Sequence, residues 1–320
     1  MKGPGYHRSS AADVLVLALL ALTALLALAA CGGPTENAMV LPTPSATGTI
    51  AIETAPGGKK GIYLVNADRS GLRRVVENPG LTEDPAWSPD GSQIVYVVYP
   101  KGTGDSRRAS LWLANADGSG QRQVTSGDVN GFMPSWSPDG TQIAFAQTLP
   151  PEVANTAVIN ADGSGLKRLT DTSGSDFGSV WTRDGRILFA HGGSLFAINP
   201  DGSGRTELTA FGHVENCLIA LSPDGTKLAL QTLGTPSHIA VFPFPDGGTP
   251  VKLLDPLSDY LMNNRRAAMS WTPDGKALVV AASDELEPDG SRLFVINADG
   301  SGLSAVPGIK FAWNPAWRPE

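Results

Sequence analysis

The chain has 320 residues, of which only 17% are charged, while glycine (37) and proline (25) are abundant. The formal net charge is −7 and no run of Lys or Arg exceeds two residues, which excludes the basic stripe that nucleic-acid binding requires. Few charges and many turn-forming residues favour short strands over long helices, and no helical periodicity is sustained beyond residue 31.

The first thirty residues differ in character from the rest of the chain. Lys2 and Arg8 precede residues 14–30, which are apolar apart from Thr23. A basic start followed by an apolar core predicts an export signal over residues 1–30. Two readings follow from the residues alone: a cleaved secretory signal, or an uncleaved anchor, because the apolar segment is just long enough to span a bilayer.

The apolar segment ends in "LAAC" (28–31), which resembles the lipobox of bacterial lipoproteins. The resemblance implies cleavage before Cys31 and diacylation of its thiol. Residues 31–47 would then be a lipidated cysteine and a flexible tether, and we expect an exported protein on the outer face of the cytoplasmic membrane or in the outer membrane. Cys217 would be the only remaining thiol, so we expect no intramolecular disulfide.

A segment containing Trp, Pro and Asp-Gly is repeated along residues 48–320. Its aspartate recurs every 40 to 50 residues, a period that matches the blade of a β-propeller rather than a helical solenoid. The copies are "AWSPDGSQIVYVV" (86–98), "SWSPDGTQIAFAQ" (135–147), "VWTRDGRILFA" (180–190), "ALSPDGTKLALQT" (220–232), "SWTPDGKALVVAA" (270–282) and the stub "AWRPE" (316–320).

A second motif lies between these copies, as in "NADGSG" at 115–120, 160–165 and 297–302. Its alternating Asn, Asp and Ser resemble a calcium loop, but the helix and the bidentate Glu that such a loop needs are missing. Asp-Gly between apolar runs instead predicts a hairpin turn. Each unit therefore contains four strands, with one turn after the first strand and the other after the third.

The two ends of the repeat region complement each other. Residues 48–55, 61–67 and 72–78 provide the second, third and fourth strands of a blade that lacks its first, and residues 311–319 provide that strand. We therefore predict an all-β, six-bladed propeller with four-stranded antiparallel blades, in which one blade is closed by both chain ends. Such closure removes exposed sheet edges.

This arrangement resembles the TolB-type propeller family, whose repeats carry W-S-P-D-G followed by a run like I-A-F. The resemblance covers residues 48–320 and implies the propeller fold. It specifies function less closely, because propellers of this type have unrelated activities. The amino-terminal domain of TolB has no counterpart in the sequence, where the signal and tether stand in its place.

The sequence contains little that indicates catalysis, and we expect neither an enzyme nor a bound cofactor or metal. No G-x-S-x-G motif is present, and His191, His213 and His238 have no metal-ligand spacing. We expect Cys217 to be a buried structural thiol. The tryptophans of the repeat could form a stacking surface, but their fixed place in each unit predicts packing between blades; they are Trp87, Trp136, Trp181, Trp271 and Trp317.

The connections between strands two and three, and those between blades, differ from blade to blade, whereas the turns are nearly identical. Varied loops on a rigid scaffold can be tolerated surface, but binding also concentrates there. We expect an interaction face around the mouth of the central channel, and the "YLMNNRR" segment (260–266) combines residue types of an interface hot spot. The candidate residues are Glu83, Asp84, Asn130, Phe132, Asp176, Phe177, Glu215, Asn216, Tyr260, Asn263, Asn264, Arg265, Arg266 and Trp313.

The sequence therefore predicts a monomeric, lipid-anchored propeller that binds envelope proteins as an interaction or scaffold module. A receptor for a glycan or another small ligand at the channel mouth is the main alternative. An enzyme with a metal bound between blades is a further one, because propeller ligands can come from different blades. The residues do not identify the partner, the ligand or the membrane.

Overall fold

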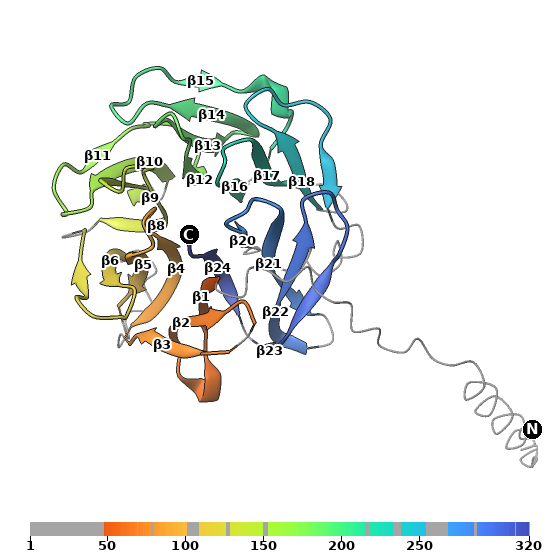
Figure 1. Cartoon of the computed structure of the whole chain (residues 1–320). Helices are drawn as coiled ribbons and strands as arrows, with labels where there is room; N and C mark the ends of the chain where they lie inside the picture. Colours follow the sequence, from red (N-terminus) through yellow and green to blue (C-terminus); the bar gives the residue numbers. More distant parts are fainter. Residues whose placement is uncertain are drawn as a thin grey trace, which may run out of the picture. The chain divides into compact units, whose positions relative to one another are not determined.

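The alternating apolar runs pair into six four-stranded antiparallel sheets arranged around a common centre (Figure 1). This computed structural model describes residues 48–319 apart from 69, 78–79, 101–108, 126–128, 150–152, 215–217, 233–237, 254–267, 285–286 and 311. The predicted six-bladed propeller is confirmed. Short 3-10 turns lie at Pro56–Gly58 (η1) and Thr209–Phe211 (η3), and no helix in this part of the chain is long and apolar enough to cross a bilayer.

We number the blades in chain order and give their strands from the centre outward. Blade one contains β24 (Trp313–Trp317), β1 (Thr49–Thr54), β2 (Gly61–Asn66) and β3 (Arg73–Val76). Blade two contains β4 (Leu81–Trp87), β5 (Gln93–Tyr99), β6 (Ser110–Asn115) and β7 (Arg122–Gln123). Blade three contains β8 (Asn130–Trp136), β9 (Gln142–Leu149), β10 (Val153–Asn160) and β11 (Lys167–Arg168).

The remaining blades follow the same order. Blade four contains β12 (Asp176–Trp181), β13 (Ile187–His191), β14 (Ser194–Ile198) and β15 (Thr206–Glu207). Blade five contains β16 (Ile219–Leu221), β17 (Lys227–Thr232), β18 (His238–Pro243) and β19 (Val251–Leu253). Blade six contains β20 (Met269–Trp271), β21 (Ala277–Asp284), β22 (Glu287–Asn297) and β23 (Ser304–Lys310).

Blade one joins the two ends of the described chain. β1 pairs with β2 on one side, with Thr49 opposite Asn66, and with β24 on the other, with Ile50 opposite Trp317. The first strand that the N-terminal segment lacks is therefore supplied from the C-terminus, as predicted.

Both repeated motifs form turns, as predicted. In the first, the Ser88 hydroxyl and the Ser92 N–H donate to Asp90 Oδ1 at 2.6 and 3.0 Å. These bonds, with those of the Ser92 hydroxyl, lower the pKa of Asp90 from 3.8 to about 2 because they stabilise the carboxylate. In the second, the Ser164 N–H donates to Asp162 Oδ1 at 2.8 Å.

The repeated tryptophans pack between blades. All five side chains are buried, none more than 9% exposed. The Trp87 Nε1–H donates to Ala316 O of blade one at 3.1 Å, and that of Trp136 donates to Ala86 O of blade two at 3.2 Å. Trp271 makes the same contact with Ala220 O at 2.9 Å, so these three indoles tie their inner strands to the preceding blade. The burial of all five confirms the packing role.

Candidate functional site

The two ends of the strands form two distinct faces. We call the end that carries the two repeated turns the turn face, and the end that carries the connections between strands two and three and between blades the loop face. Thr49, at the start of β1, pairs with Asn66 beside a repeated turn and therefore lies at the turn face. Thr54 pairs with Gly61 across the 55–60 connection and lies at the loop face.

The inner strands of all six blades line a central channel of about 290 Å³. Each inner strand runs from the loop face towards the turn face, and its lining residues lie one to four positions before the repeated tryptophan or its equivalent. Tyr99, which pairs with Leu81 at the loop-face end of β4, also lines the channel, so the channel reaches that face. Its surface is mostly apolar, with polar groups interspersed. Representative lining residues, one from each blade, are Asn314, Asp84, Phe132, Gly178, Leu218 and Met269.

A backbone irregularity recurs at this channel, three residues before the repeated tryptophan. Asp84, Met133 and Asn314 have φ values of 51°, 53° and 46°, and Gly178 takes the same position with φ 67°. The strand pairing shifts register there, as between Glu83 and Ala86. Residues other than glycine adopt this left-handed conformation at an energetic cost, which Asn and Asp bear more easily than Met. Such strain tends to gather at functional sites.

Polar contacts connect three blades at the channel. The Asn314 Nδ2–H donates to Asp84 Oδ1 at 2.8 Å and to Glu53 Oε2 at 3.3 Å, and the Met133 N–H donates to Asp84 Oδ2 at 3.1 Å. Glu83, beside Asp84, is only 5% exposed. The left-handed residues are thus held in place by their neighbours, and the channel lining is preorganised.

Of the predicted interaction residues, Glu83, Asp84 and Phe132 line the channel. Trp313 lies on β24 and is partly exposed, and Phe177 lines a separate pocket in blade four. Seven predicted residues, together with Cys31 and Cys217, lie outside the described residues: Glu215, Asn216, Tyr260, Asn263, Asn264, Arg265 and Arg266.

Asn130 and Asp176 were predicted to ring the channel mouth, but their side chains lie in the interior. Asn130 is 7% exposed, and its Oδ1 accepts the Ala109 N–H at 3.0 Å. Asp176 is completely buried. The reason is register: these residues lie six and five positions before their tryptophan, whereas the channel-lining residues lie four to one positions before it.

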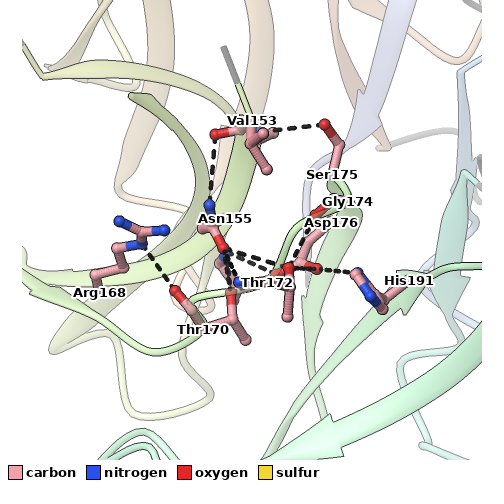
Figure 2. A network of polar contacts seen from close by, with 11 residues as sticks. Val153, Asn155, Arg168, Thr170, Thr172, Gly174, Ser175, Asp176 and His191 are labelled. Carbon is pink, nitrogen blue, oxygen red and sulfur yellow. Dashed lines mark hydrogen bonds and ion pairs between the residues drawn. The ribbon is translucent and has the colours of Figure 1, made fainter. Parts of the chain in front are cut away.

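Asp176 is the centre of a buried polar network (Figure 2). Its Oδ2 accepts the Thr156 N–H at 3.1 Å and the Thr170 hydroxyl, while its Oδ1 accepts the Thr172 hydroxyl at 3.3 Å. His191 Nδ1 lies 2.9 Å from Oδ1. Sequence reasoning missed this pair because His191 shares no metal-ligand spacing with another residue. A comparison of the repeats could have found the pair, because blade four carries two ionisable residues at a position where blades two and three carry none.

The described residues include no group of three or more His, Cys, Asp or Glu side chains placed to hold a metal ion.

A family model described as the TolB beta propeller domain matches residues 102–320. TolB from Acinetobacter baumannii is 21% identical with a TM-score of 0.69, over 88% of this chain and 68% of that one. A chain of the nidogen/laminin complex is 13% identical with a TM-score of 0.61, over 85% and 98%. An oligogalacturonate lyase in complex with manganese is 15% identical with a TM-score of 0.57, over 82% and 74%. At these identities the likeness shows the fold alone, and no curated protein matches the chain significantly.

Proposed function

The chain belongs to the TolB beta propeller domain family, and from that premise we propose that it is an exported, lipid-anchored module that binds envelope proteins through its loop face. The observation that carries the proposal is the channel mouth, where six inner strands meet at an apolar surface with polar neighbours. The propeller fold supports a protein-interaction role. The function that we propose is non-catalytic.

The chemistry of the mouth suits a protein partner. Phe132, Met133 and Met269 offer aromatic and thioether surface, and Glu83 and Asp84 add acidic groups beside it. Aromatic and methionine side chains are enriched in interfaces, where a few central anchors provide most of the binding energy. Because hydrogen bonds already hold Asp84 and Asn314, binding there loses little conformational entropy.

We extend the proposed surface to the 260–266 segment, which lies outside the described residues. It contains Tyr260, Arg265 and Arg266, residue types that recur among interface hot spots, and it precedes the inner strand of blade six in the sequence. The export signal and "LAAC" (28–31) support the envelope location, with Cys31 carrying the lipid.

Photo-crosslinking in cells tests the proposal. A photoreactive residue is placed at Phe132 in the channel, and a matched one at Leu166, which is 42% exposed beside a turn of the turn face. We expect an adduct with an envelope protein from position 132 and none from position 166. In a second experiment the photoreactive residue is placed at Tyr260. Adding the Phe132→Glu substitution to that chain should weaken the adduct formed from position 260.

The outcomes separate the alternatives. Equal adducts from both positions would contradict the assignment to the loop face. The absence of a protein adduct at position 132 and at position 260 would favour a small-ligand receptor at the channel mouth. An activity that appears only with added Mn²⁺ would favour an enzyme. One propeller of similar fold is an oligogalacturonate lyase in complex with manganese.

A further inference from the structure

Blade four departs from its neighbours at one cross-strand position. On the inner pair of strands, Asp176 lies directly opposite His191. At the same register, blade two places Thr82 opposite Val98, and blade three places Gly131 opposite Gln147. Those two blades form the same sheet without an ionisable pair, so the scaffold does not require one.

A buried carboxylate is also an expensive choice for the structural task that Asp176 performs. In blade two the interior backbone N–H of Ala109 is satisfied by the neutral amide oxygen of Asn130. Asp176 accepts a comparable N–H from Thr156, but as a carboxylate with no exposed surface. Burying a carboxylate costs more than burying an amide unless charge or several donors compensate it. Asp176 also accepts the hydroxyls of Thr170 and Thr172, which compensate part of this cost, and His191 is its ionisable partner among the described residues.

The contact orients the imidazole. Asp176 Oδ1 accepts a hydrogen bond from the Nδ1–H of His191. In the neutral ring the proton is therefore on Nδ1, and Nε2 is an acceptor. The His191 side chain is 21% exposed, and it lines a pocket of about 320 Å³ at the loop face. Figure 2 shows the ring at the edge of the network, with its second nitrogen directed away from Asp176.

The remaining pocket walls leave room for a ligand. Phe177 lines one part, and the hairpin formed by Gly192 and Gly193 lines another, with φ values of 56° and 87°. A Cβ added to Gly192 would meet nothing within 4 Å, whereas one added to Gly193 would clash with the His213 ring, so the hairpin is open on its Gly192 side only. The volume is at the lower end of the range for small-ligand sites, roughly 300–1,000 Å³. This pocket shares no lining residue with the central channel.

We propose that the blade-four pocket binds a sugar unit, with His191 Nε2 accepting a hydrogen bond from a sugar hydroxyl and Phe177 packing against the C–H face of the ring. A hydroxyl is the ligand group that suits this site in both states of the imidazole. It donates to neutral Nε2, and it accepts from Nε2–H when the ring is charged. An ammonium group would lose its acceptor and be repelled by the charged ring. The inference does not rest on the proposed function.

Saturation-transfer NMR on the full chain tests the site, with glucose, galactose, mannose and N-acetylglucosamine as the probes. His191→Asn retains a donor to Asp176 in place of Nδ1 and deletes Nε2, so the fold stays satisfied. We expect at least one probe to bind, and this variant to bind it about tenfold more weakly, the effect of losing one hydrogen bond of a typical strength.

His191→Gln is the matched variant, because its amide reaches towards the place of Nε2 while it loses the contact with Asp176. The site predicts that His191→Gln binds the sugar better than His191→Asn, although it has the lower Tm. A purely structural role predicts no difference in binding. If no probe gives a saturable signal, or if His191→Asn binds as tightly as the native chain, the proposal is wrong. Crosslinking from position 132 should be unchanged in both variants.

Discussion

Asn314 and Asp84 are 230 residues apart in the sequence, and the Asn314 Nδ2–H donates to Asp84 Oδ1 at 2.8 Å. Both residues have a positive φ, and both line the central channel. The contact joins the C-terminal strand of blade one to the inner strand of blade two. The pair therefore links the blade that closes the ring to its neighbour at the wall of the channel.

Substitutions at Asn314 should separate its two contributions. Asn314→Gly removes the side-chain hydrogen bonds and keeps the left-handed backbone, which should lower the free energy of unfolding by about 1–3 kcal/mol. Asn314→Ala removes the same bonds and adds the strain of a Cβ at φ 46°, about 1 kcal/mol more. Urea denaturation of both variants measures the difference. Equal stabilities would show that the backbone there is not strained.

The indole hydrogen bonds between blades can be measured against an internal control. Trp87 donates to Ala316 O, whereas the buried Nε1 of Trp181 has no hydrogen-bond partner among the described residues. Replacement by Phe removes similar apolar surface at both sites. We expect Trp87→Phe to destabilise the fold by about 1 kcal/mol more than Trp181→Phe, because only the first removes a hydrogen bond. The same loss at both sites would assign the tryptophans to packing alone.

The turn aspartates should make stability fall in acid. The pKa of Asp90 and that of Asp224 are lowered from 3.8 to about 2, each first by the hydroxyl two residues earlier. Since the unfolded chain takes up these protons at a higher pH, the free energy of unfolding decreases as the pH falls from about 4 to about 2. Asp90→Asn should reduce this slope, as seen in urea titrations across that range. An unchanged slope would show that the turn does not stabilise the ionised carboxylate.

The proposed lipid on Cys31 can be tested by direct labelling. With a radioactive or clickable fatty acid supplied to cells, we expect label on the native chain and none on Cys31→Ala. If the native chain carries no label, the mass of the purified native chain distinguishes the remaining readings. A chain that starts near residue 31 indicates a cleaved secretory signal, and one that retains residues 1–30 indicates an uncleaved anchor. Label that persists in the variant would refute the lipobox assignment.

The fold could be predicted because the motif of one blade is repeated along the sequence. Trp, Pro and Asp-Gly recur at a steady period, and the Asp-Gly turns fix which strands pair. Even the closure by β24 followed from counting strands at the two ends. Each blade repeats the same strands and turns, so a strand that is unclear in one copy can be assigned from the others.

The candidate sites were less predictable because they lie where the repeat is broken. Asp176 was predicted as a residue of the channel mouth. Its burial and its contact with His191 depend on the strand register, and a shift of one residue would turn its side chain to the other face of the sheet. The left-handed position was also missed. A signal for it existed, since Asp84, Met133 and Asn314 each lie three residues before a repeated tryptophan and directly before a proline. The candidate sites depend on residues that differ between blades, and a repeat pattern describes only what the blades share.

The position of β1 has a mechanical consequence. The chain enters this strand at Thr49 on the turn face, and β1 is flanked on both sides by antiparallel partners, β2 and β24. A force applied ahead of Thr49 acts along the strand, so the hydrogen bonds on both flanks resist it together in shear. Peeling an outer strand would instead break them one at a time. A force applied ahead of Thr49 would thus load a strand that is paired on both sides, at the end of the strand opposite the loop face.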